Sequence, residues 1–298
     1  MNSSNNASTV LVAGATGFLG SEVCRQLVQK NKKVKGLVRA TSDPTKVASL
    51  KELGVETIIG DLKNKTSLEK AMSGVSAIIS TVSSSLSRQE GDSIQTVDDD
   101  GQINLIDAAV GAGIDQFVYV SFCSMVGEFP LQTAKRKVEQ HLEASGLKYT
   151  ILLPTYFMEV WLSPALGFDA PNGKATIYGD GKKRVSWISI KDVASFAVAA
   201  LDNPKAKNKR IELGGPTALS PLEVVKIYEA NRGRKFELEF VPEAALKAQR
   251  EAAEDPLSAS FASLMLNVAK GSEINMKTAN TLFQLPLTAV NDFAKGLW

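Results

Sequence analysis

A chain of 298 residues is long enough to bury one large hydrophobic core or two smaller ones, so we expect one principal domain with a smaller appendage. Its 44% hydrophobic and 22% charged residues are typical of a globular protein, and no apolar run approaches the roughly 18 residues of a membrane span. The formal net charge of +2 is too small to attract nucleic acid, so we expect neither a membrane nor nucleic acid as a partner.

The two cysteines, Cys24 and Cys123, lie far apart in the sequence and form no CxxC or His/Cys cluster. This argues against a disulfide framework and against a metal site, so we expect no metal. Residues 1–8 are polar and lack the regions of a signal peptide, which predicts a disordered lead-in and a cytoplasmic protein.

The first half of the chain alternates short β-branched runs with helical patterns. This alternation is typical of βαβ units, which build a parallel sheet with helices on both faces. The predicted strands are Val10–Ala13, Lys33–Val38, Glu56–Ile59, Ala77–Thr81, Gln116–Val120 and Tyr149–Leu153, and the predicted helices are Leu19–Gln29, Pro44–Leu53, Ser67–Ser73, Thr96–Ala112 and Thr133–Ser145.

The regularity weakens after Pro154. Shorter strand patterns separated by turns give way to helical patterns that continue to the end of the chain. Here the predicted strands are Ala175–Tyr178, Arg184–Ile188 and Arg210–Leu213, and the first predicted helix is Lys191–Leu201.

The strongest motif is the run from Val10 to Gly20, a strand that enters a GxxGxxG turn and then a helix. In such a turn the glycines allow a tight bend, a close approach of the backbone to a pyrophosphate, and packing of helix on strand. The helix N-terminus presents N–H groups and a partial positive charge to the phosphates. The motif predicts a dinucleotide site with contacts from Gly14, Ala15, Thr16, Gly17, Phe18 and Leu19.

The end of the second predicted strand indicates which dinucleotide binds. An acidic residue about 20 positions after the glycines would accept a hydrogen bond from a ribose 2′-hydroxyl and select NAD. This sequence has Arg39 there, and a guanidinium suits a 2′-phosphate. We therefore expect NADP rather than NAD; an ordinary surface arginine is the alternative, and Arg25 and Lys35 could assist.

Other cofactor contacts are predicted where the third and fourth strands end. Asp61 could accept a hydrogen bond from an adenine amino group, or it could cap a turn. Leu62, Thr81 and Val82 fall at the sheet edge that receives the ligand in doubly wound folds. The polar segment Ser83–Gly101 is interpreted as a solvated loop with a helix N-terminus at its end, and a flap over the nicotinamide end is the alternative.

These patterns predict an α/β fold: a doubly wound, parallel-sheet Rossmann domain over residues 9–155, to which residues 184–215 return. The rest, residues 156–298, is predicted to be a smaller, mostly helical substrate domain.

Four segments together resemble NmrA-like and isoflavone-reductase-like members of the atypical short-chain dehydrogenase/reductase superfamily. They are the Gly14–Gly20 turn, Gly60–Leu62, the block Gly101–Ala109 that runs into Phe117–Ser121, and Lys135–Phe157. The resemblance covers about the first 215 residues. It implies a hydride-transferring fold, NADP as the usual cofactor, and a smaller C-terminal substrate domain.

Typical short-chain dehydrogenases use a Tyr-x-x-x-Lys pair, in which the lysine lowers the pKa of the phenol. Here Leu131 stands four residues before Lys135, so the tyrosine is missing. The isoflavone-reductase-like branch also lacks it and keeps a lysine that matches Lys135. The resemblance implies that Lys135 contacts the nicotinamide ribose and polarises a substrate carbonyl, whereas a solvated helix start is the alternative.

Two hydroxyls and one loop complete the predicted site. Ser121 and Ser124 stand where related enzymes place a hydroxyl facing the substrate carbonyl, and Cys123 between them is interpreted as a small buried residue. The single histidine, His141, is expected to be solvated, which disfavours Ser-His-Asp hydrolysis. The segment that passes beside the nicotinamide in the family matches Pro154, Tyr156 and Phe157, and further apolar residues could line a pocket: Met158, Trp161, Phe261, Leu264, Met265 and Val268.

The sequence thus predicts an NADP(H)-dependent oxidoreductase that reduces a small carbonyl, enone or quinone-like substrate. The alternative is a non-catalytic NADP(H)-binding redox sensor or partner-binding protein, which the missing tyrosine favours. A nucleotide-sugar epimerase would need that tyrosine, so Leu131 argues against it. The predicted oligomeric state is a monomer or homodimer.

Overall fold

The computed structural model describes residues 9–86 and 88–296, so the predicted lead-in lies outside the described residues. A seven-stranded sheet has the order β3-β2-β1-β4-β5-β6-β9. Strand β1 runs parallel to both β2 and β4, and the pairs β2–β3, β4–β5 and β5–β6 are also parallel. The strands are β1 (Thr9–Ala13), β2 (Lys33–Val38), β3 (Glu56–Ile59), β4 (Val75–Ser80), β5 (Gln116–Val120), β6 (Lys148–Pro154) and β9 (Lys209–Leu213).

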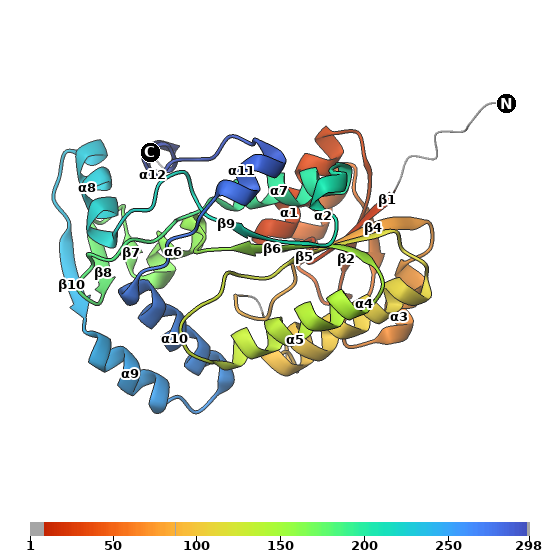
Figure 1. Ribbon diagram of the computed structural model, residues 1–298, viewed down its shortest axis with the longest axis horizontal. Helices are drawn as coiled ribbons and strands as arrows, with labels where there is room; N and C mark the ends of the chain where they lie inside the picture. The colour runs from red at the N-terminus through yellow and green to blue at the C-terminus, as the bar shows by residue number, and fades with distance from the viewer. Residues whose placement is uncertain (1–8, 87, 297–298) are drawn as a thin grey trace. The chain divides into compact units, whose positions relative to one another are not determined.

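Helices cover both faces of this sheet, with α3, α4 and α5 on one face and α1, α2 and α7 on the other (Figure 1). The strand order reverses between β1 and β4, which is the point where doubly wound sheets bind ligands. The predicted fold class is therefore confirmed. The helices are α1 (Phe18–Gln29), α2 (Pro44–Glu52), α3 (Lys65–Ala71), α4 (Asp100–Gly111), α5 (Pro130–Ala144) and α7 (Ile190–Asp202).

Burial explains why the first strand and helix form where they do. The residues Val10–Ala13 are all buried, as expected for a central strand covered on both faces. In α1 the buried residues Leu19, Val23 and Leu27 recur every four positions and so form one apolar stripe along the helix. Local patterns of this kind place the strand ends, and with them the candidate site.

The predicted helix Thr96–Ala112 is divided in the structure. A π-helix, η1 (Ile94–Asp99), precedes α4 and begins with a reciprocal capping box between Ser93 and Thr96. Asp98 and Asp99 in this turn are buried, and Asp98 Oδ2 accepts hydrogen bonds from the backbone N and the Oγ of Ser84 at 3.0 and 2.6 Å. Short π-helical turns are frequent at functional sites.

The chain forms two compact units. Among the described residues, the first consists of those from Thr9 to Ser121, Ala134–Leu152 and Ala194–Arg210, and the second of Phe122–Thr133, Leu153–Val193 and residues 211–296.

The second unit has its own aromatic core and a three-stranded sheet of order β10-β8-β7. The rings of Phe168 and Tyr228 meet edge to face at 4.9 Å between centroids. The elements wholly within this unit are α6 (Met158–Trp161), the 3-10 turn η2 (Pro164–Leu166), β7 (Phe168–Asp169), β8 (Lys174–Tyr178), α8 (Pro221–Arg232), β10 (Glu237–Val241), α9 (Glu243–Glu251), α10 (Pro256–Lys270), α11 (Lys277–Phe283) and α12 (Val290–Gly296). A further 3-10 turn, η3 (Pro204–Ala206), belongs to the first unit.

Two predictions for this part of the chain were wrong. The segment 184–188 is no continuous strand: Val185 makes isolated bridges to Leu219 and Ser272, and Ile188 makes one to Phe157. The residues that bridge to this segment lie in separate parts of the chain, so an alternating pattern of apolar and polar residues within the segment could not reveal them. Strand β10 was expected to be helical; it pairs in parallel with β8 and exposes Glu237 and half of Phe240, so it lacks the apolar run of a buried strand.

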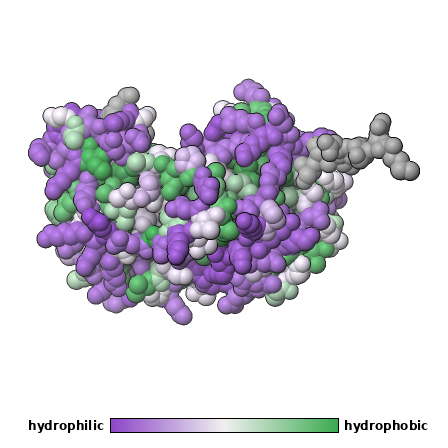
Figure 2. Space-filling model, turned by 45° about the horizontal axis from the view of Figure 1, so that its top comes forward, coloured by the Kyte–Doolittle hydropathy of each residue, from purple (hydrophilic) through white to green (hydrophobic). Residues whose placement is uncertain are grey.

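The surface drawn in Figure 2 is mostly hydrophilic, with hydrophobic residues in separate areas. The exposed large apolar side chains are spread along the sequence, from Phe18 to Phe240. Scattered residues of this kind are normal on globular proteins. No helix in the described ranges is both long enough and apolar enough to cross a membrane.

Candidate functional site

The turn after β1 is built so that only glycine fits at its ends. Gly14 has a φ of +83°, and its carbonyl accepts a hydrogen bond from Gly17 N at 2.9 Å. A Cβ atom on Gly20 would lie 2.0 Å from the Gly14 carbonyl oxygen, which is far inside van der Waals contact. Helix α1 therefore packs directly on the turn, as a dinucleotide-binding glycine pattern requires.

The N-terminus of α1 is suited to an anion. Its N-cap, Gly17, provides no capping side chain, and no acidic residue lies in the first turn. The N–H groups of this turn can therefore be satisfied by a phosphate, which the helix dipole also favours. Ala15 and Leu19 are buried beneath the turn, Thr16 is half-buried, and Phe18 is 70% exposed beside it. These residues fit the pyrophosphate of a dinucleotide.

Two residues that follow the carboxyl end of β4 contact the glycine-turn strand and Lys135, respectively. Thr81 donates to the Ala13 carbonyl through both its backbone N and its Oγ1, each at 3.0 Å. The next carbonyl, that of Val82, accepts from Lys135 Nζ at 3.4 Å and from Gln102 Nε2 at 3.0 Å. Gln102 was not singled out from the sequence; its side chain also accepts a hydrogen bond from Ser80 Oγ at 2.8 Å.

Lys135 is buried, with 4% of its surface exposed, so it is no solvated helix start. Its Nζ lies 3.3 Å from Asp98 Oδ1 and 5.4 Å from the centre of the Tyr119 ring. A buried ammonium needs such partners because desolvation of an isolated charge is costly. Burial above all, and then the negative charge of Asp98, raises the pKa of Tyr119 well above its usual value, so this phenol stays protonated.

Ser121 is linked to a second buried carboxylate. Its Oγ donates to Glu139, which also binds Arg136 and lies 2.5 Å from Arg210 Nη2. Glu139 is completely buried and stands one helical turn after Lys135. Sequence reasoning missed it, although its four-residue spacing from Lys135 was a signal that both side chains share one helix face.

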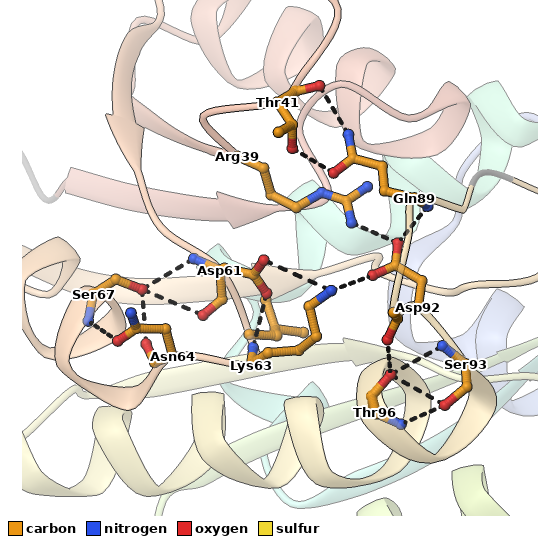
Figure 3. Close-up of polar contacts among 12 residues, drawn as sticks. Arg39, Thr41, Asp61, Lys63, Asn64, Ser67, Gln89, Asp92, Ser93 and Thr96 are labelled. Carbon is orange, nitrogen blue, oxygen red and sulfur yellow. Dashed lines mark hydrogen bonds and ion pairs between the residues drawn. The ribbon is translucent and has the colours of Figure 1, made fainter.

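Arg39 and Asp61 lie in a polar cluster after strands β2 and β3 (Figure 3). Arg39 Nη1 donates to Asp92 Oδ2 at 2.6 Å, and the Arg39 side chain is 27% exposed. Asp61 Oδ1 accepts from the backbone N of Lys63 at 2.8 Å, which is the turn-capping role that competed with adenine binding. Leu62 is buried, and its carbonyl accepts from Asn104 Nδ2 at 2.9 Å.

Asp92 carries a perturbed carboxyl in this cluster. Burial acts to raise its pKa, but hydrogen bonds from Lys63, from Arg39 and from the backbone of Gln89 outweigh burial and hold the pKa below its usual value. Asp92 is therefore ionised at neutral pH. Neither Asp92 nor Lys63 was singled out from the sequence, because their pairing joins segments far apart in the chain.

The remaining predicted residues belong to the second unit. The Pro154 carbonyl accepts from Cys123 N at 3.0 Å, Ser124 is exposed, and Phe157 is half-buried. Tyr156 is 2% exposed and donates to the Leu264 carbonyl at 3.3 Å. Burial raises the pKa of Tyr156 well above its usual value, so this phenol stays protonated and donates to a helix carbonyl. Much of the predicted apolar wall is core: Met158 and Val268 are buried, and Trp161 packs against the same cluster.

The single histidine and the cysteines offer little chemistry. His141 Nε2 lies 2.7 Å from Asp107 Oδ1 on a partly exposed face. Cys24 and Cys123 are both buried, and burial raises the pKa of the Cys24 thiol to about 12. Within residues 9–86 and 88–296, no three His, Cys, Asp or Glu side chains are grouped so that they could hold a metal ion.

Comparison with known proteins identifies several relatives by sequence. The chain is 34% identical over 232 residues to an NAD(P)H azoreductase of Xenophilus azovorans, covering 76% of this chain and 74% of that protein. It is 31% identical to the photosystem II assembly factor Ycf39 of Trieres chinensis, with 80% and 74% covered, and 30% identical to the isoflavone reductase homolog IRL of Zea mays, with 84% and 83% covered.

A similar fold occurs in an NADPH-dependent quinone oxidoreductase of Escherichia coli, QOR2, solved as a complex with NADPH. The TM-score is 0.78 at 22% identity, covering 97% of this chain and 99% of that one. Residues 6–285 match the NmrA-like family. This match spans nearly the whole chain and confirms the resemblance seen in the glycine turn and the Lys135 segment, so the chain belongs to the NmrA-like family.

Proposed function

We propose that this protein is an NADP(H)-dependent oxidoreductase that reduces a small carbonyl, enone or quinone-like substrate. One observation carries the proposal: directly after β4, Thr81 hydrogen-bonds to Ala13 in the strand that leads into the glycine turn, and the next carbonyl, that of Val82, accepts from the buried ammonium of Lys135. A dinucleotide bound along the turn would bring its reactive ring toward this strand end.

The preference for NADP(H) rests on the charges after β2 and β3. Arg39 and Lys63 are two cations where a ribose 2′-phosphate would be recognised. The name of QOR2 specifies NADPH as its cofactor, which supports the same preference, whereas the name of the azoreductase, NAD(P)H, covers both cofactors.

Lys135 is the proposed catalytic cation. Bound NADPH would supply the hydride, and negative charge would develop on the substrate oxygen. Asp98 and the Val82 carbonyl hold the ammonium, which would donate to the ribose and stabilise the developing oxyanion. The hydroxyls of Ser121 and Ser124 would orient the substrate. The hydrogen bond that Ser121 donates to Glu139 would hold the Ser121 hydroxyl in place.

The second unit would supply substrate specificity. Pro154, Tyr156 and Phe157 are proposed to line the nicotinamide side of the cofactor. We retain the predicted cytoplasmic location and the monomeric or homodimeric state as predictions.

A second candidate is a non-catalytic NADP(H)-binding protein that reports redox state or assists assembly. Two observations favour it: Leu131 stands in place of the expected tyrosine, and one relative is called an assembly factor. Both candidates require the same cofactor, so binding alone does not separate them.

The decisive experiment is a titration with NADPH and with NADH, followed by nicotinamide fluorescence, and then addition of quinones, enones, azo dyes and aromatic aldehydes. We expect NADPH to bind about tenfold more tightly than NADH, a difference of about 1.4 kcal/mol. Oxidation of NADPH by any acceptor supports the oxidoreductase. Tight binding without turnover supports the second candidate, and absence of binding by either nucleotide contradicts both.

A further inference from the structure

The cation pair of Arg39 and Lys63 already holds an anion from the protein itself. Asp92 lies between β4 and η1, and only 2% of its side chain is exposed. Its Oδ2 accepts from Arg39 Nη1 at 2.6 Å and its Oδ1 from Lys63 Nζ at 2.7 Å (Figure 3). Each carboxylate oxygen thus faces one member of the pair, with the short distances of charge-assisted hydrogen bonds.

Asp92 is also held in place by its own segment. The backbone N of Gln89 donates to Asp92 Oδ2 at 2.9 Å, and Gln89 Nε2 donates to the Thr41 carbonyl at 2.8 Å. The carboxylate is therefore fastened beside the loop that follows β2. It is a built part of the cluster, not a side chain resting on the surface.

The Arg39–Lys63 pair lies where the ribose of a bound dinucleotide is expected. Arg39 directly follows β2 and Lys63 follows β3, and both strands lie on the same side of β1 and its glycine turn. The ribose 2′ position of a dinucleotide is recognised at the end of the second strand in this kind of fold. A 2′-phosphate would therefore bind the same two donors, Arg39 Nη1 and Lys63 Nζ, that now donate to Asp92.

A carboxylate at this position favours binding of NAD(H) over NADP(H). An Asp or Glu near the ribose accepts a hydrogen bond from the free 2′-hydroxyl of NAD, whereas it repels a 2′-phosphate. We propose that Asp92 occupies the 2′-phosphate position on the Arg39–Lys63 pair, so that NADP(H) binds by displacing this carboxylate and NAD(H) binds with it in place. Asp92 is then a specificity-determining residue that keeps the protein able to use both cofactors. The proposal rests on the proposed dinucleotide binding.

The test compares dissociation constants of NADPH and NADH for the wild type and for Asp92→Asn, measured by calorimetry without any acceptor. The variant keeps the shape of the side chain but removes the competing charge. We expect NADPH to bind about tenfold more tightly to the variant, and NADH to bind equally or more weakly. Glu90→Gln is the matched control: Glu90 is exposed two residues away, and its neutralisation should leave the affinity ratio unchanged.

A second variant covers the case in which Asp92→Asn does not fold. Lys63→Met removes one member of the pair and should weaken NADPH about tenfold while leaving NADH unchanged. An unchanged ratio in either folded variant, or weaker NADPH binding by Asp92→Asn, overturns the proposal. If the wild type binds neither nucleotide, the proposed function fails; if it binds both and the ratio does not move, only this inference fails.

Discussion

Lys135 and Asp98 form a buried ion pair in which Nζ and Oδ1 are 3.3 Å apart and neither side chain is more than 5% exposed. Asp98 also accepts two hydrogen bonds from Ser84, so the carboxylate is held from the opposite side. The pair keeps a charged lysine inside the protein at the end of β4. Asp98 is thus a positioning residue for the proposed catalytic cation.

Neutralising Asp98 should destabilise the protein, because it leaves the Lys135 ammonium buried without a counter-charge. We expect Asp98→Asn to lower the free energy of unfolding by about 3 kcal/mol. The double variant Asp98→Asn/Lys135→Met should recover part of this loss. Urea unfolding of the single and double variants measures the coupling, with Asp100→Asn, at an exposed neighbour, as the control. Additive effects would contradict the importance of the pair.

Removal of the Lys135 ammonium should affect chemistry more than cofactor binding. For Lys135→Met we expect turnover with an accepted substrate to fall by about 10²–10³, because a donor to the developing oxyanion is lost. The dissociation constant of NADPH should change by less than about fivefold, or about 1 kcal/mol. Lys137→Met is the control, since Lys137 is half-exposed and pairs with Asp99. Undiminished turnover by a folded Lys135→Met protein would exclude the catalytic role.

Two glycine-to-alanine variants should separate the cost of a steric clash in the glycine turn from the gain of a less flexible unfolded chain. Gly20→Ala would push a Cβ into the Gly14 carbonyl oxygen, so we expect a loss of about 3 kcal/mol or more and weaker nucleotide binding. Gly111→Ala, at the end of α4, meets no atom within 4 Å and should stabilise by about 0.5 kcal/mol. Thermal unfolding of both variants checks the contrast, and equal stability would refute the close packing at Gly20.

The contribution of the Asp92 carboxylate to the free energy of unfolding should fall at acid pH. Its pKa is lowered in the folded protein, so the folded state binds fewer protons than the unfolded state just below the ordinary aspartate pKa of about 3.9. The stabilisation is fully present above that pH and is lost as pH falls through the lower, folded value. The difference in unfolding free energy between wild type and Asp92→Asn should be constant from about pH 7 to 5 and shrink below about pH 4. Urea unfolding across this range measures it, and a difference that grows on acidification would reverse the assigned sign.

Several elements could be predicted because their signals are local. Lys33–Val38, Glu56–Ile59 and Gln116–Val120 coincide with observed strands, since β-branched runs bounded by turns are recognised from a few neighbouring residues. Strand β10 and the segment 184–188 were mispredicted because their pairing depends on partners far away in the chain. The π-helix before α4 was missed for a related reason: its buried aspartates turn inward toward Ser84 and two lysines that no local pattern connects to them.

The candidate site divides in the same way. The sequence by itself determined the strand, turn and helix of the dinucleotide site, because the tight turn at Gly14 and the close packing at Gly20 exclude other residues whatever surrounds them. It also determined that Arg39 replaces an acid and that Lys135 lacks a tyrosine partner. Only the tertiary structure decided which charges meet: Lys135 with Asp98, Ser121 with Glu139, and Arg39 with Asp92. A buried charge must find a partner, and which partner it finds depends on how distant segments pack.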